Sequence, residues 1–167
     1  MSLKIKMGLS QNDVKQAIKQ LEDYKKELTF KTKVLVERLA GIGVGVIQAR
    51  MHPKSDDELV VELINPEILE SGNHVSTIIG IKGRDVAFIE FGAGVYYNEN
   101  PGSSPHPYGQ SLGMLIGSYG KGHGLEDYWY FNGELKHGTL AGMPVWTASH
   151  EIQNQIRAIA SEVFGGG

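Results

Sequence analysis

Apolar residues recur at helical spacing over the first forty positions, and they are Val14, Ala17, Ile18, Leu21, Tyr24, Leu28, Leu35 and Leu39. Ser10 and Asp13 lie three residues apart just before this pattern, as in the capping box that starts many helices. A helix from residue 10 to residue 40 would be about 45 Å long at 1.5 Å per residue. A small domain cannot cover that length, so we expect part of the helix to contact a partner. The alternative is a break near Thr29 into two packed helices.

Three later segments are rich in apolar β-formers, at residues 59–64, 75–81 and 86–91. The last two are joined through residues 82–85 and are predicted to form a hairpin. A second hairpin is predicted for residues 128–131 and 135–137. Its turn falls at Asn132-Gly133, a pair that is suited to the positive φ angles of tight turns.

The chain ends in a second helical pattern that begins at residues 144–147 and continues through Ala148, Ile152, Ile156, Ile159 and Val163. The glycines at 165–167 act as a stop. The predicted fold class is α+β. It consists of a long N-terminal helix, a small antiparallel β-sheet with a long glycine-rich loop, and a C-terminal helix packed on the sheet. Residues 1–167 are predicted to form one domain.

The predicted strand 86–91 runs directly into a glycine-rich segment, residues 93–127, which is predicted to be a mobile loop outside the core. Gly92 and Gly94, at the junction, are expected to adopt backbone angles that other residues reach only at a cost. Glu90 is an acid within an apolar segment. We expect it to pair with a base or to cap the backbone of the loop.

Composition excludes several classes of function. A net charge of −3 and a pI near 6.1 argue against broad attraction to nucleic acid or anionic membranes. The chain has no cysteine, and therefore no disulfide, thiolate metal ligand or cysteine nucleophile. No apolar run reaches the roughly 18 to 20 residues of a membrane span, and the first residues lack a secretory pattern, so synthesis in the cytoplasm is expected.

No motif supplies a catalytic set, a cofactor site or a metal site, and none of these is predicted. The glycine-rich stretch 117–124 fails as a phosphate loop because Lys121 is not followed by Ser or Thr. Two alternatives remain open. One is a metal-assisted hydrolase that uses the 92–127 loop with His106, His123 and Asp127. The other is a small-ligand binder whose stacking faces are Tyr96, Tyr97, Tyr119 and Trp129.

Four segments together carry a family resemblance. They are Phe-Ile-Glu-Phe-Gly-Ala-Gly-Val at 88–95, Trp-Tyr-Phe at 129–131, His-Gly-Thr-Leu-Ala-Gly-Met-Pro-Val-Trp at 137–146, and the helix end at 159–164. In order and spacing they resemble the minor structural proteins of long-tailed bacteriophages that are called tail-component or tail-completion proteins. Ala93 departs from the pattern, which often has Thr at that position.

The resemblance implies a non-enzymatic virion component at the phage neck or tail end, present in the host cytoplasm during assembly. Its partners would be further copies of itself in a ring, a tail-tube or tail-terminator protein, and head-connector proteins. Neither a membrane nor a specific nucleic-acid sequence would be bound. The loop would serve assembly, with hinge and assembly residues Glu90, Phe91, Gly92, Gly94, Trp129, Gly138, Gly142 and Pro144.

Overall fold

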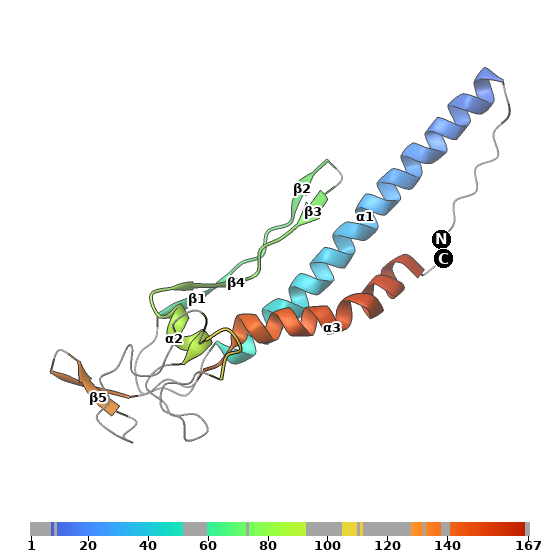
Figure 1. Ribbon diagram of the computed structural model, residues 1–167. Helices are drawn as coiled ribbons and strands as arrows, with labels where there is room; N and C mark the ends of the chain where they lie inside the picture. The colour runs from blue at the N-terminus through green and yellow to red at the C-terminus, as the bar shows by residue number, and fades with distance from the viewer. Residues whose placement is uncertain are drawn as a thin grey trace. The chain divides into compact units, whose positions relative to one another are not determined.

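The computed structural model describes residues 8, 10–51, 60–72, 74–92, 105–109, 111, 128–131, 133–137 and 141–165 (Figure 1). The fold is α+β, as predicted. Its helices are α1 (Gln11–Arg50), α2 (Val86–Phe91) and α3 (Pro144–Gly165). Its strands are β1 (Val61–Ile64), β2 (Leu69–Ser71), β3 (His74–Ser76), β4 (Gly80–Gly83), β5 (Tyr128–Phe131) and β6 (Glu134–His137).

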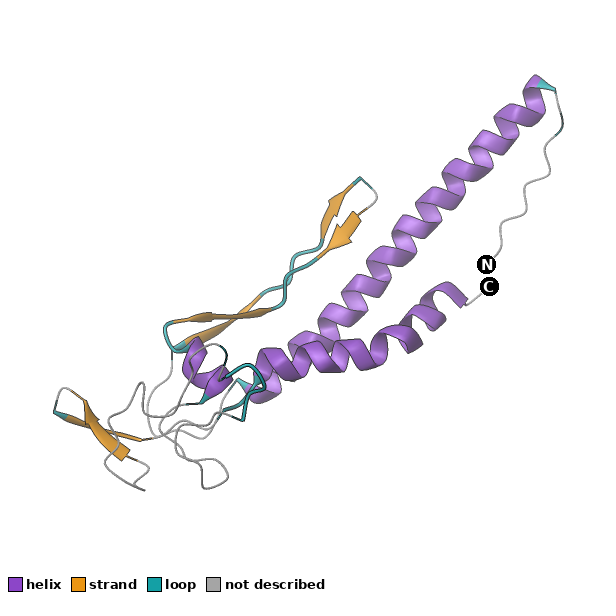
Figure 2. Cartoon of the chain, in the orientation of Figure 1, coloured by secondary structure: helices purple, strands orange, loops and turns teal. Residues whose placement is uncertain are grey.

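The described strands form antiparallel pairs, β1 with β4, β2 with β3, and β5 with β6 (Figure 2). Val61 lies opposite Gly83 and Ile64 opposite Gly80 in the first pair. The chain divides into two compact units, one of Met1–Gly41, Pro66–Ile78 and Ile152–Gly167, and the other of Ile42–Asn65 and Ile79–Glu151. We refer to these as unit 1 and unit 2.

Helix α1 is one continuous helix of 40 residues, about 60 Å at 1.5 Å per residue. The predicted capping box is confirmed, because the Asp13 N–H donates to Ser10 Oγ at 3.2 Å and the Ser10 N–H donates to Asp13 Oδ2 at 3.3 Å. The alternative break near Thr29 is wrong. The helix also continues past residue 40, to Arg50. Ile47 in its last turns is fully buried and packs these turns into the core of unit 2.

The prediction of a strand at 86–91 is wrong, because this segment is α2. Its most buried residues, Ile89 and Glu90, are adjacent in sequence, so they cannot both face inward from a strand whose side chains alternate. A helical turn places them beside Val86, which also packs on the core. The predicted hairpin of 75–81 with 86–91 is therefore absent, and β4 pairs with β1 instead.

The core of unit 2 joins four elements. Its buried members are Ile47 and Met51 at the end of α1, Ile81 of β4, Ile89 of α2 and Ala148 of α3. The predicted packing of the C-terminal helix on the sheet is confirmed here by Ala148, which belongs to the same cluster as Ile81. The second predicted hairpin is also confirmed, since β5 pairs with β6 and Gly133 in the turn has a φ of 84°.

Ion pairs connect the elements of unit 1. Lys33 of α1 contacts Glu70 of β2 at 2.8 Å, and Arg38 of α1 contacts Glu162 of α3 at 2.9 Å. The hydrogen bond that Lys33 donates to the Glu70 carboxylate raises the pKa of the Lys33 amine. No helix in the described part of the chain is long and apolar enough to cross a membrane.

Candidate functional site

Glu90 is the centre of a buried polar site in unit 2. It lies on α2, one residue before the helix ends at Phe91, and it is only 7% exposed. A buried carboxylate is stable only when hydrogen-bond donors surround it, because leaving water removes its hydration. Three donors meet its two oxygens, and they come from two segments that are distant in the sequence.

Two of the donors are backbone groups in the first turn of α3. The Val145 N–H donates to Glu90 Oε2 and the Trp146 N–H donates to Oε1, each at 2.9 Å. The first N–H groups of a helix have no partner within the helix and usually bond the side chain of the residue before it. Here that residue is Met143, which cannot accept such bonds. Glu90 therefore caps α3 from 55 residues away, with a charge that the helix N-terminus favours.

The third donor is His106, whose Nε2 lies 3.3 Å from Glu90 Oε1. The other ring nitrogen, Nδ1, accepts the N–H of Tyr108 at 3.0 Å. An imidazole nitrogen that accepts a hydrogen bond carries no hydrogen, so the neutral ring has its hydrogen on Nε2 and donates it to Glu90. This arrangement fixes both the tautomer and the orientation of a side chain that is 6% exposed.

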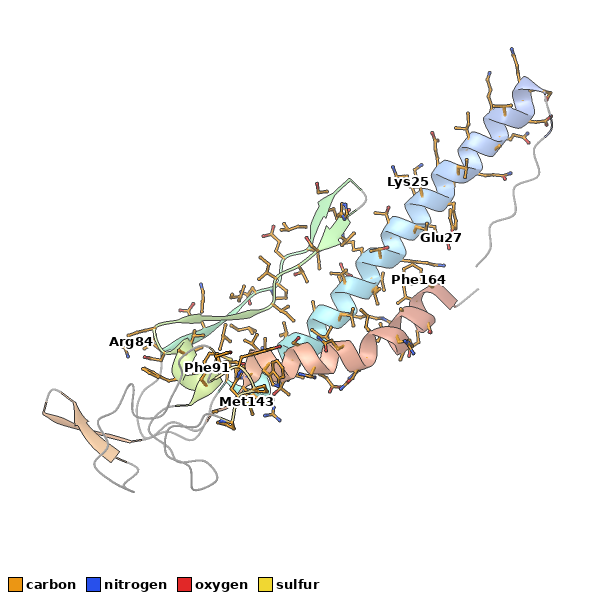
Figure 3. The ribbon with its side chains drawn as sticks, viewed as in Figure 1. Lys25, Glu27, Arg84, Phe91, Met143 and Phe164 are labelled. Atoms are coloured by element: carbon orange, nitrogen blue, oxygen red, sulfur yellow. The ribbon has the colours of Figure 1, made fainter. Side chains whose placement is uncertain are left out.

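Aromatic rings enclose the Glu90–His106 pair. The His106 ring centroid lies 4.3 Å from that of Phe91 and 5.4 Å from that of Trp146. Trp146 in turn lies 5.1 Å from Tyr108 and 4.4 Å from His150, both edge to face. Such tilted contacts are favourable for aromatic pairs and also keep water from the carboxylate. Figure 3 labels Phe91 and Met143, which mark the end of α2 and the residue before α3.

A backbone contact next to the carboxylate joins the same two segments. The Gly142 N–H donates to the carbonyl of Ile89 at 2.8 Å, and the Arg50 guanidinium donates to the Gly142 carbonyl at 3.3 Å. A Cβ at position 142 would lie 2.6 Å from the Arg50 carbonyl oxygen. Only glycine therefore allows this approach. Met143, which follows, has a φ of 47°, a conformation that is uncommon outside glycine.

Asp85 fixes the other end of α2. Its carboxylate accepts the Val60 N–H at 2.8 Å and is held by the Arg84 guanidinium at 3.1 Å. The Arg84 hydrogen bond, together with the Val60 N–H, lowers the pKa of this buried carboxyl group against the opposing effect of burial. Because both ends of α2 are fixed, Glu90 is held in one position.

A carboxylate beside an imidazole is also the arrangement of many proton-transfer sites, but the hydrogen bonds here oppose that use. Both Glu90 oxygens accept helix N–H groups, and the His106 nitrogen that could take a proton already accepts the Tyr108 N–H. The arrangement stabilises a joint between α2, residues 105–109 and α3.

The structure brings together most of the residues singled out from the sequence. Glu90, Phe91, Gly142 and Pro144 lie in the joint, and Gly92 ends α2 directly beside it. The expected unusual backbone at Gly92 is confirmed by its φ of 77°. Trp129 lies on β5. Gly94 and Gly138 fall outside the described residues, as do His123, Asp127 and most of the segment 93–127.

His106 corrects one expectation about that segment. The segment was expected to lie outside the core, yet His106 is buried against Glu90, so residues 105–109 belong to the packed structure. The sequence contains one signal for this, the Pro105-His106-Pro107 triplet, which restricts the backbone on both sides of the histidine. Among the described side chains, no three His, Asp or Glu groups gather as metal ligands.

Unit 1 has a groove of about 560 Å³ between α1 and β2. It is lined by Glu22, Lys25, Lys26, Thr29, Phe30, Lys33 and Glu70. The Phe30 side chain is 66% exposed, and the lysine stems supply further apolar surface.

Comparisons of the chain with family models, with curated proteins and with solved structures give no match.

Proposed function

We propose that the chain is a structural subunit of a long-tailed bacteriophage, which forms a ring at the neck or tail end and joins or completes the tail for head attachment. The observation that carries the proposal is the apolar surface of α1. Val14, Ile18 and Leu21 are 40%, 51% and 53% exposed on one side of this helix. A contiguous exposed apolar surface is typical of a protein that binds another protein.

The Glu90 joint supports a structural role. Its side chains satisfy one another's hydrogen bonds, and they connect three segments without leaving a free acid or base for turnover. A subunit that transmits force between two parts of a virion needs such fixed connections. Glu90, Phe91, Gly142 and Trp146 of the joint also come from segments that carry the resemblance to tail-completion proteins, at 88–95 and 137–146, whereas His106 and Tyr108 do not.

The test is to delete the coding sequence from a phage or prophage that carries it and to examine lysates by electron microscopy. The proposal expects filled heads and separate tails, with joined virions restored by the wild-type gene supplied in trans. A gene with Glu67→Ala, a change at an exposed position, serves as the matched control and should restore joining as well. Joined, infectious virions from the deletion would refute the proposal.

A further inference from the structure

The apolar residues at the N-terminal end of α1 follow the repeat of a helix that packs along another helix. Val14, Leu21 and Leu28 are seven residues apart, with Ile18 between the first two. A seven-residue apolar repeat keeps one stripe facing a neighbouring helix. We call these four residues the α1 seam. They are 38% to 53% exposed.

The same stripe is covered further along α1. Thr32, Leu35 and Leu39 continue the seam and are only partly exposed. Ile42 and Val46, the next positions of the repeat, are also only partly exposed, and Val46 packs against the core of unit 2. The chain thus covers the second half of the stripe, and in the first half it buries Ala17, at 6%, but leaves the four seam residues exposed. A second helix of matching pattern is the kind of partner that would complete it.

The charges beside the seam favour a second copy of this chain in antiparallel orientation. In a parallel pair, Lys25, which occupies the seam between Leu21 and Leu28, would face Lys25 of the second copy. In an antiparallel pair with Ile18 opposite Leu21 of the second copy, Lys25 faces an apolar residue. That register also places Lys15 near Glu22 of the other copy, twice, because the pair is symmetric.

We infer that the α1 seam pairs with the α1 seam of a second copy as an antiparallel, two-fold contact. The seam spans 15 residues, about 22 Å of helix, and is short for a stable interface, so the affinity is expected in the micromolar range. A two-fold contact cannot by itself close a ring. The contact uses the same α1 surface that supports the proposed function, and it would hold free subunits as pairs with this surface covered before they enter the ring.

Cysteine cross-linking tests both the contact and its direction, because the chain contains no cysteine of its own. Ile18→Cys and Leu21→Cys are made as separate variants and oxidised, alone and as an equimolar mixture. The antiparallel contact expects a cross-linked dimer in the mixture and none from either variant alone. A parallel contact would instead cross-link each variant with itself, and this result would overturn the inference, as would the absence of any cross-link.

Sedimentation of the uncrosslinked full-length protein across the micromolar range provides a second measurement. The wild type is expected to change from monomer to dimer, and Leu21→Lys should weaken the dimer at least about 100-fold, since it removes two buried leucines per pair. Gln16→Lys adds the same charge on the side of α1 that faces away from Val14 and Ile18, at an exposed position, and should leave the dimer unchanged. Equal effects of the two substitutions would overturn the inference.

Charge reversal tests the register. Lys15→Glu and Glu22→Lys should each weaken the dimer about fivefold, and the double variant should recover the wild-type affinity. A double variant that binds no better than the single variants would contradict the register.

The outcomes of these experiments also separate this inference from the proposed function. A dimer without any defect in phage joining would refute only the function, and unjoined heads with a monomeric protein would refute only the seam contact.

Discussion

Replacing Glu90 by alanine tests whether the joint between α2 and α3 stabilises unit 2. The change leaves the N–H groups of Val145 and Trp146 and the Nε2–H of His106 without their acceptor. An unsatisfied buried donor costs about 1 to 3 kcal/mol, and loss of a helix cap alone costs about 1 kcal/mol. Water can reach some of these groups in the variant, which reduces the cost below the sum of these values. We therefore expect the free energy of unfolding to fall by about 3 kcal/mol.

That loss is large against the total stability of a domain, which is about 5 to 15 kcal/mol. Glu90→Gln should cost less, about 1 to 2 kcal/mol, because its amide oxygen still accepts one N–H group. The amide NH₂ group of the variant replaces the other carboxylate oxygen, so one backbone N–H group of α3 loses its acceptor. The ordering of the two variants follows from the number of N–H groups that lose their acceptor, which is a property of the joint and not of side-chain volume.

The assay is urea unfolding followed by the fluorescence of the two tryptophans and by circular dichroism. Trp146 lies in the joint, so its environment reports the loss of this part of unit 2. Glu67→Ala, at an exposed position, is the matched control and should change stability by no more than about 0.5 kcal/mol. If Glu90→Ala were as stable as this control, the capping role of Glu90 would be refuted.

Three further predictions concern the surroundings of the joint. Gly142→Ala should lower the free energy of unfolding by about 1 to 3 kcal/mol because its Cβ meets backbone at 2.6 Å, whereas Gly45→Ala, in open space on α1, should raise it by about 0.5 to 1 kcal/mol; equal effects in urea unfolding would contradict this. The lowered pKa of Asp85 stabilises the folded chain above the unfolded-state value, near 3.8, and this stabilisation is lost as the pH falls through the folded-state pKa. Asp85→Asn should therefore be destabilised at pH 7 by an amount that shrinks in acid, and a difference independent of pH would refute the assignment. Finally, deletion of residues 97–123 removes His106 and should lower the melting temperature, whereas deletion of 112–123 should change it little; the reverse order would exclude a stabilising role for residues 105–109.

The sequence predicted the elements whose pattern is local. The capping box at Ser10, the turn at Gly133 and the helix that starts at Pro144 are each specified by a few neighbouring residues, and the structure confirms all three. The α+β class follows from those elements. Local residue types also drew attention to Glu90, because an acid within an apolar segment needs a specific partner.

The segment 86–91 was predicted as a strand because Val, Phe and Ile favour strands when considered one at a time. Its actual state is decided by tertiary contacts. Ile89 must reach the core with Met51 and Ile81, while Glu90 must reach the first turn of α3. Met51 and the first turn of α3 are both distant in sequence, although Ile81 is only eight residues away. The position of His106 could not be predicted for the same reason, since it depends on a contact across 16 residues with a carboxylate that the helix orients.

Two segments that were singled out from the sequence, 88–95 and 137–146, complete each other's hydrogen bonds in this chain. One contains Ile89 and Glu90, which present a carbonyl and a carboxylate, and the other contains Gly142 and the first turn of α3, which present N–H groups. Each segment alone leaves polar groups unsatisfied, and together they complete a joint. Pro144 starts α3 without an N–H of its own, and Met143 before it cannot cap, so the distant acid is required. An acid in an apolar segment, followed later by a Gly-x-Pro helix start without a capping residue, is therefore a sequence signal for a joint of this kind.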